Sequence, residues 1–159
     1  MPRQALTQQA SSSDAFAGLL HAYARATRRL NALLLAEHDL TLSDYEVLLR
    51  LARAPGRRLR RVDLAEQVLL TASGITRLLD GLEAAGYVER GSCDTDRRVV
   101  YAVLTDAGLE KIRAAQRSHV AQVAELFAER LDQEETAELA TLLRKLGRGA
   151  ADDDCDAAI

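Results

Sequence analysis

The sequence predicts a mainly helical protein that carries one small β-hairpin. Alanine, leucine, arginine and glutamate dominate, and only 2 of the 159 residues are proline, a composition that favours helices. One β-prone stretch, residues 87–104, interrupts the helical periodicity and is split by a polar loop. A chain of this length fits a single domain that can bury a core.

The first two helices are predicted from apolar spacing and from capping residues. A long helix over 14–36, capped by Ser12 or Ser13, repeats apolar residues at helical spacing. Ser43 and Glu46 have the spacing of a capping box, which predicts the start of a second helix.

A compact helical pair follows in the middle of the chain. The proline-glycine pair at 55–56 ends the second helix, and Leu59 is a candidate for a single-residue bridge to the later hairpin. A short third helix is expected over 62–68. Thr71 is a good N-cap for a fourth helix over 72–85.

The hairpin and the fifth helix come next. Gly86 ends the fourth helix, because a residue without a Cβ readily takes the left-handed conformation. The runs 87–90 and 99–104 are expected to pair as strands. Thr105 then caps a long helix over 106–129.

The C-terminal part is predicted to hold one more helix and a tail. Asp132 and Glu135 resemble a second capping box, and the helix that they begin runs to Gly147. Residues 1–12 are expected to be a disordered tail, and residues 148–159 an acidic flexible one.

Positive charge collects in the middle of the chain, although the net charge is −3. Residues 50–104 carry 10 basic and 7 acidic groups, whereas residues 1–49 carry 4 and 5, and residues 105–159 carry 7 and 12. A basic segment suits a double-stranded DNA partner, since neutralising phosphates supplies most of the non-specific affinity.

Several other classes of protein are disfavoured. The histidines (His21, His38 and His119) have neither metal-ligand spacing nor a paired nucleophile, and no glycine-rich phosphate loop is present. We therefore expect no catalytic residue, no metal and no cofactor. No apolar run approaches the roughly 20 residues of a membrane helix, and the first residues lack a signal-peptide core, so we expect a cytoplasmic protein without a membrane partner.

The cysteines do not form a disulfide framework. Cys93 lies in the hairpin loop and Cys155 in the acidic tail. The neighbouring arginines make Cys93 a candidate redox-sensing thiol. The alternative is an incidental exposed thiol.

The terminal helices carry more apolar residues than a small central head could cover. A two-fold dimer with interleaved helices would bury them. It would also separate two heads by one turn of DNA, roughly 34 Å, which matches a palindromic operator. The residues concerned are Ile112, Val120, Val123, Leu126, Phe127, Leu139, Leu142, Leu143 and Leu146.

This order of elements resembles the MarR (multiple-antibiotic-resistance) family of winged-helix transcriptional regulators. The resemblance covers about residues 14–146. Its most specific stretch is LLDGLEAAGYVER at 78–90, followed by DTDRR at 94–98 and VLTDAG at 103–108. The family's Asp-x-Arg wing pattern falls within the second of these segments.

The resemblance implies a winged helix-turn-helix with long N- and C-terminal dimerisation helices. It divides a single domain over 13–147 into dimerisation helices at 13–54 and 105–147 and a DNA-binding head at 55–104. It also implies a homodimer that represses transcription at a palindromic operator. The alternative is a winged-helix module whose arginines bind acidic protein partners without DNA readout.

In the family the fourth helix reads the major groove. Arg77 is the candidate for guanine readout, since a guanidinium can engage O6 and N7 together. Its alternative is a salt bridge to Asp80 or Asp94. Gly74 allows close approach to DNA or merely relieves helix packing. The residues that map to the groove are Thr71, Ala72, Ser73, Gly74, Thr76 and Arg77.

The wing and a second arginine cluster complete the expected DNA contacts. Arg97 and Arg98 map to the wing, with Asp96 orienting an arginine, and Arg98 is expected in the minor groove. Four further arginines are candidates for phosphate contacts, or else are solvated: Arg57, Arg58, Arg60 and Arg61.

Many family members release DNA when a small anionic or aromatic ligand binds between the head and the dimerisation helices. Neither the reactive cysteine of the peroxide-sensing members, near the start of the first helix, nor the tryptophan of the urate-responsive members is present, so the effector stays open. Each candidate pocket residue could equally serve the core, an interface or the surface: His21, Tyr23, Arg25, Arg28, His38 and Tyr45.

Overall fold

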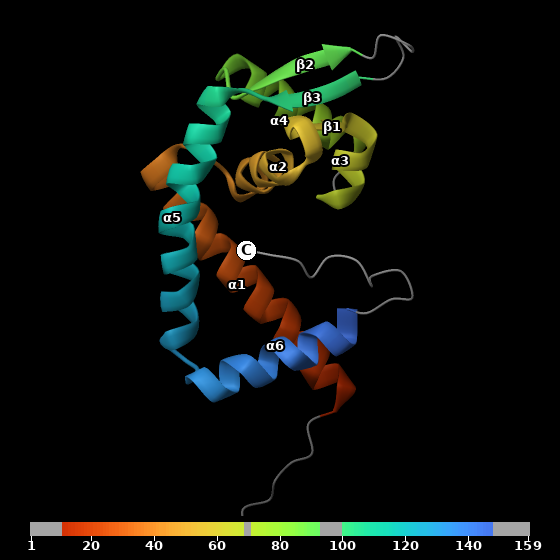
Figure 1. Cartoon of the computed structure of the whole chain (residues 1–159). Helices are drawn as coiled ribbons and strands as arrows, with labels where there is room; N and C mark the ends of the chain where they lie inside the picture. Colours follow the sequence, from red (N-terminus) through yellow and green to blue (C-terminus); the bar gives the residue numbers. More distant parts are fainter. Residues whose placement is uncertain (1–10, 69–70, 93–99, 148–159) are drawn as a thin grey trace, which may run out of the picture. The chain divides into compact units, whose positions relative to one another are not determined.

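The computed structural model describes residues 11–68, 71–92 and 100–147. Within these ranges helices dominate and a small three-stranded sheet interrupts them, which confirms the predicted fold class (Figure 1). The elements in chain order are α1 (Ser12–His38), α2 (Leu42–Arg53), the 3₁₀ turn η1 (Pro55–Arg57), β1 (Arg58–Arg60), α3 (Arg61–Gln67), α4 (Ala72–Ala84), β2 (Val88–Ser92), β3 (Val100–Leu104), α5 (Asp106–Ala128) and α6 (Gln133–Gly147).

The chain forms two compact units, residues 1–119 and residues 120–159, and α5 contributes to both. Side chains of α2 and of the first turns of α5 pack into the same core as those of α3, α4 and the sheet. None of the helices in the described ranges combines the length and the apolar composition needed to cross a bilayer.

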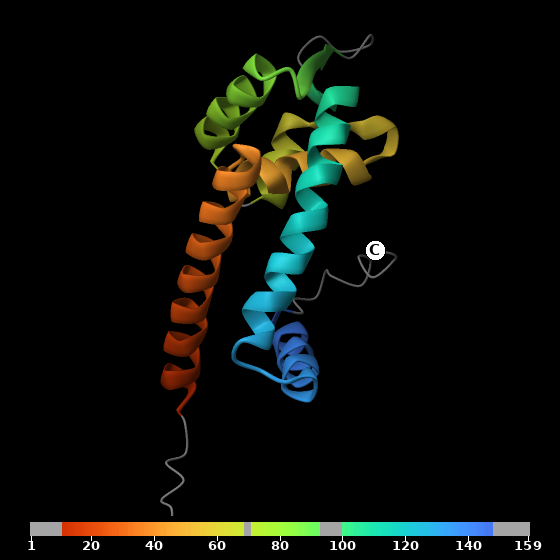
Figure 2. The same cartoon turned by 90° about the vertical axis from the view of Figure 1, so that its left-hand side faces the viewer.

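Capping boxes begin both α1, which is one uninterrupted helix (Figure 2), and α2. The Ser11 hydroxyl accepts from the Asp14 N–H at 3.2 Å, and Thr41 accepts from the Asp44 N–H at 3.1 Å. An N-cap needs extended backbone, which Ser11 and Thr41 have and residues inside the first turn lack. The expected caps are therefore wrong by one or two residues: Ser12 or Ser13 for α1, and Ser43 with Glu46 for α2.

The remaining helix starts agree with the sequence. The Thr71 hydroxyl accepts from the Gly74 N–H at 3.1 Å, and α6 begins at the reciprocal pair Asp132 and Glu135, with both bonds at 2.9 Å. Ser12 already lies in α1, so the N-terminal tail is shorter than expected. The remainder of that tail and residues 148–159 lie outside the described residues.

The sheet has the strand order β1-β3-β2 and is antiparallel throughout. Leu59 pairs with Ala102, so the expected single-residue bridge is a three-residue strand. The sheet packs on α2, α3 and α4 around a continuous apolar core. Burying each large side chain contributes roughly 1.5–3 kcal/mol. The largest fully buried side chains are Leu34, Leu40, Val47, Leu48, Leu51, Leu64, Leu79 and Ile112.

A tight joint connects β2 to the start of α5. The Thr105 hydroxyl donates to the Gly86 carbonyl at 2.7 Å and accepts from the Gly108 N–H at 3.0 Å. A Cβ at Gly108 would collide with the Tyr87 carbonyl oxygen and lie 2.7 Å from Leu104 Cδ1. Only glycine lets the first turn of α5 lie this close to the backbone that enters β2.

Replacing Gly108 with alanine is therefore expected to destabilise the protein. The added methyl meets backbone that cannot move cheaply, and overpacking of this kind costs about 1–3 kcal/mol. The control is Gly81→Ala in α4, where no atom lies within 4 Å of the added Cβ, and where alanine is the better helix former by about 1 kcal/mol. Urea unfolding measures both free energies. A Gly108→Ala protein as stable as the wild type would contradict the close contact.

Candidate nucleic-acid interface

The apolar stripe of α4 decides which of its side chains face solvent. Ile75, Leu79 and Leu82 are at most 4% exposed, and this spacing defines the inner face of the helix. Ser73 and Arg77 lie one turn apart and are exposed. The N-terminal turns of α4 therefore present a polar, cationic surface.

The six residues predicted to face the groove do not share one environment. Thr71, Ser73 and Arg77 are exposed, whereas Gly74 and Thr76 are half-buried. Ala72 begins α4, and its side chain lies outside the described part of the structure. Thr71 and Ser73 are also joined, since their hydroxyl oxygens are 3.2 Å apart.

Arg77 has no hydrogen-bond or ion-pair partner among the described residues. Asp80, one of its expected alternatives, instead accepts from Arg90 at 2.7 Å. Asp94, the other alternative, lies outside the described residues. The guanidinium that the sequence singled out for base readout is thus an exposed cation on the outer face of α4.

Thr76 is held by the preceding helix. The Arg61 Nη2 donates to the Thr76 hydroxyl at 2.6 Å in a half-buried position. Arg61, a predicted phosphate ligand, therefore also connects α3 to α4. The two helices of the predicted helix-turn-helix are tied through a residue that the sequence assigned to DNA.

Two other members of the predicted phosphate cluster pair with carboxylates. Arg57 donates to Asp106 at 2.8 Å, and Arg60 makes two bonds to Asp63 at 2.7 and 2.6 Å. Exposed pairs of this kind contribute about 0–1 kcal/mol, so phosphates can compete for these arginines.

Arg58 differs from its neighbours in the cluster. Its guanidinium lies over the Tyr101 ring, 5.0 Å from the centroid, and it has no carboxylate partner among the described residues. The aromatic ring positions the cation without neutralising it. Arg58 and Arg61 are therefore the two members of the cluster whose charge no described carboxylate neutralises.

Arg90 is an interacting residue that the sequence analysis did not identify. From β2 it donates through Nε to both carboxylate oxygens of Glu83, at 2.9 and 2.8 Å, and through Nη2 to Asp80 at 2.7 Å. The hydrogen bonds and negative charge of Glu83, followed by those of Asp80, raise the pKa of Arg90. We call these three residues the Arg90 bracket. Their separations of 7 and 10 residues give no helical-face signal by which sequence could find them.

The wing itself is described only along its strands. β2 and β3 pair from Val88 with Leu104 to Ser92 with Val100. The predicted wing contacts Asp96, Arg97 and Arg98 lie outside the described residues, as do both cysteines.

The residues proposed for a ligand pocket fall into two places. Tyr45 is buried, with its ring centroid 4.4 Å from that of His119, and His38 Nε2 lies 2.6 Å from the Ser118 hydroxyl. Both therefore contact α5. The other four are exposed along α1: His21, Tyr23, Arg25 and Arg28.

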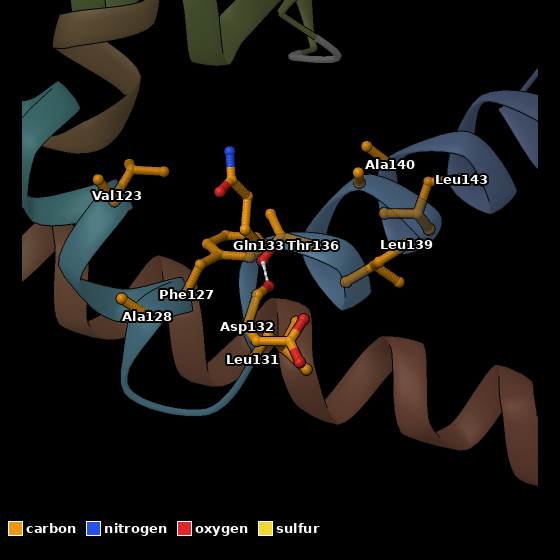
Figure 3. A pocket seen from close by; sticks show the side chains of 12 residues that line it. Val123, Phe127, Ala128, Leu131, Asp132, Gln133, Thr136, Leu139, Ala140 and Leu143 are labelled. Carbon is orange, nitrogen blue, oxygen red and sulfur yellow. Dashed lines mark hydrogen bonds between the residues drawn. The ribbon is translucent and has the colours of Figure 1, made fainter.

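An apolar trough of about 700 Å³ lies between the end of α5 and α6 (Figure 3). Val123 and Phe127 from α5 and Leu139 and Leu143 from α6 line it, with alanines between them. None of the six predicted ligand residues lines this trough.

Comparisons with known proteins identify the family. The sequence pattern of the MarR family matches residues 38–99. An uncharacterised helix-turn-helix-type transcriptional regulator of Bacillus subtilis, YkoM, is 31% identical over 111 residues, which are 70% of either chain. The chain belongs to the MarR family. The predicted resemblance is thereby confirmed.

Solved MarR family structures share the fold. AbsC from Streptomyces coelicolor is 33% identical with a TM-score of 0.75, covering 86% of this chain and 93% of its own. Sco3205 from the same organism, solved in complex with DNA, is 29% identical with a TM-score of 0.77, and 89% of each chain is covered. A mutant of E. coli MarR complexed with operator DNA is 26% identical with a TM-score of 0.73, covering 83% of this chain and 93% of that one.

The half-buried His119, whose ring lies against that of Tyr45, predicts a pH dependence of stability. Burial against Tyr45 lowers the pKa of His119, and its Nδ1 is buried without a hydrogen-bond partner. The unfolded chain then binds more protons than the folded one below the ordinary value of 6.5. The contribution of neutral His119 to the free energy of unfolding is therefore fully present above pH 6.5. It declines as the pH falls from there towards the lowered pKa of the folded protein.

Urea unfolding of the wild type and of His119→Gln, from about pH 7.5 to about pH 5, isolates this effect because other groups titrate in both proteins. The wild type is expected to lose more free energy of unfolding towards low pH than the variant. Equal losses in the two proteins would show that His119 does not titrate differently on folding.

Proposed function

We propose that this protein is a homodimeric repressor that reads a palindromic DNA operator with α4 and the wing and leaves it when a small ligand binds. The exposed Arg77 on α4 is the observation that carries the proposal, because its guanidinium is free of carboxylates within the described ranges and stands on a helix whose inner face is buried. Relatives of the same fold bind DNA, as Sco3205 and E. coli MarR do in their crystals.

The charge distribution supports the same function. Residues 50–104 hold 10 of the 21 basic residues, and Arg58 and Arg77 lack a carboxylate partner among the described residues. A DNA duplex would be drawn to this segment in spite of the acidic remainder of the chain. Arg97 and Arg98 of the wing are proposed to add contacts beside those of α4. A partner of this kind implies a location where DNA is accessible, which we take to be the cytoplasm.

Exposed apolar faces support a homodimer. On α1, Phe16, Leu20 and Tyr23 are 63%, 51% and 68% exposed, and on α6, Leu142 and Leu146 are 52% and 73% exposed. Each set follows helical spacing, so each forms one continuous stripe beside polar residues. Stripes of this size on a soluble protein are typical of an interface. A second copy of the chain offers the same stripes and would cover them.

The proposed effector is a small anionic or aromatic molecule of the kind that many MarR family members bind. His38 and Tyr45 are the candidates for sensing it, because each already contacts α5. A ligand inserted there would alter how α2 packs on α5.

Replacing Arg77 with alanine is expected to weaken operator binding by about 10- to 100-fold and to relax discrimination at one base pair, because a bidentate base contact is lost. A duplex selected by the wild-type protein from random sequences is the probe, and fluorescence anisotropy measures the affinity. Arg113→Ala, an exposed arginine of α5, controls for the lost charge.

Arg98→Ala tests the wing in the same assay. If the wild type selects no duplex, or binds acidic peptides in preference, the protein is an interaction module and the DNA proposal fails. If Arg77→Ala binds as the wild type does, α4 is not the reading element.

The combined change of Leu142→Glu and Leu146→Glu is expected to give a monomer that binds the selected duplex at least about tenfold more weakly, since one head cannot span two half-sites. Light scattering measures the mass. Thr141→Glu introduces a single negative charge on α6 away from the stripe of Leu142 and Leu146 and should leave the dimer intact. A wild type that is already monomeric at micromolar concentration would refute the dimer.

A further inference from the structure

The Arg90 bracket joins the wing to the solvent-facing side of α4. Arg90 is in β2, and its two partners, Asp80 and Glu83, lie one turn apart on α4. Asp80 follows Arg77 by three residues, so the two side chains lie on the same side of α4. The bracket therefore contacts the side of the helix that carries Arg77. The inner side of α4 is held separately by Ile75 and Leu79 in the core.

The bracket is better suited to fixing geometry than to stabilising the fold. Arg90 is 56% exposed and its partners Asp80 and Glu83 are 50% and 25% exposed, and ion pairs to a cation this open to solvent contribute little to stability. A planar guanidinium with three short bonds to two carboxylates nevertheless allows few orientations. Apolar contacts along the inner stripe limit rotation of α4 less strictly, because they are non-directional.

The charges of the bracket also disfavour a direct contact between Arg90 and DNA. Arg90 is shared between two carboxylates, so the group as a whole carries one net negative charge. A phosphate would have to displace one of these carboxylates to reach the guanidinium. Arg90 is therefore placed to act through α4.

We propose that Arg90 is a positioning residue for sequence discrimination. It sets the rotation of α4 relative to β2, so that Arg77 approaches the base edges in register with the wing strands. This inference rests on the proposed DNA-binding function and adds a residue that reads no base itself. Specific binding depends on this angle, whereas non-specific binding depends mainly on charge.

The experiment compares two duplexes of equal length and composition, one selected by the wild-type protein from random sequences and one scrambled. The measured quantity is the dissociation constant for the scrambled duplex divided by that for the selected duplex, and a high ratio means strong discrimination. The salt dependence of each dissociation constant is measured as well. Arg90→Ala removes the bracket. The double variant Arg90→Ala with Glu83→Gln also lacks it but retains the net charge of the wild type, and Arg113→Ala controls for a lost exposed arginine.

Both bracket variants are expected to lower the ratio about tenfold, with affinity of the double variant for the scrambled duplex and its salt slope close to wild type. Arg90→Lys should be intermediate, since an ammonium group cannot reproduce the planar fork. The thermal midpoint is expected to change by a few degrees at most, which separates positioning from unfolding.

Three results would overturn the inference. The first is a double variant that discriminates as the wild type does, which would mean that Arg90 acts only through charge. The second is an equal loss of affinity for both duplexes, and the third is unfolding of the double variant and of Arg90→Lys alike, which would make the bracket structural. A wild type that prefers neither duplex would instead refute the proposed function itself.

Discussion

The buried stripe of α4 is the constraint on which the proposed reading surface depends. Ile75, Leu79 and Leu82 are removed from water against α2 and the sheet, and the 3.6-residue period then leaves Ser73 and Arg77 outside. The hydrophobic effect, rather than any polar contact, thus selects which side chains DNA could meet. The same period brings Asp80 and Glu83 within reach of Arg90.

Hydrogen bonds and ion pairs fix the relative orientation of helices and strands more closely than the apolar core alone does. Arg61 ties α3 to α4 through Thr76, and Arg90 ties α4 to β2. At the other end of β2, Thr105 and Gly108 hold α5 against the backbone that enters the strand. Each link joins only two elements, but together they connect α3, α4, the sheet and the first turn of α5.

The arginines of residues 50–104 fall into two groups, those paired with carboxylates and those without such a partner. The amino-acid composition does not distinguish the two groups. Arg57, Arg60 and Arg90 are paired with carboxylates, which neutralise their charge but add little to stability at this exposure. Arg58 and Arg77 lack such a match among the described residues. Arg61, which donates to the Thr76 hydroxyl, also has no carboxylate partner there, so the count of basic residues overstates how many of these cations are free of neighbouring negative charge.

The sequence by itself determined the element order, most of the caps, the outward face of α4 and the family, because these depend on periodicities and motifs that are local in the chain. It misjudged the starts of α1 and α2, where neighbouring hydroxyl residues compete for one capping position. Only the tertiary structure decided the partners of Arg61 and Arg90 and the ring contact between Tyr45 and His119, since each joins elements whose separation in sequence carries no periodic signal. Long-range side-chain pairing is fixed by how the core packs, and that packing is a property of the whole fold.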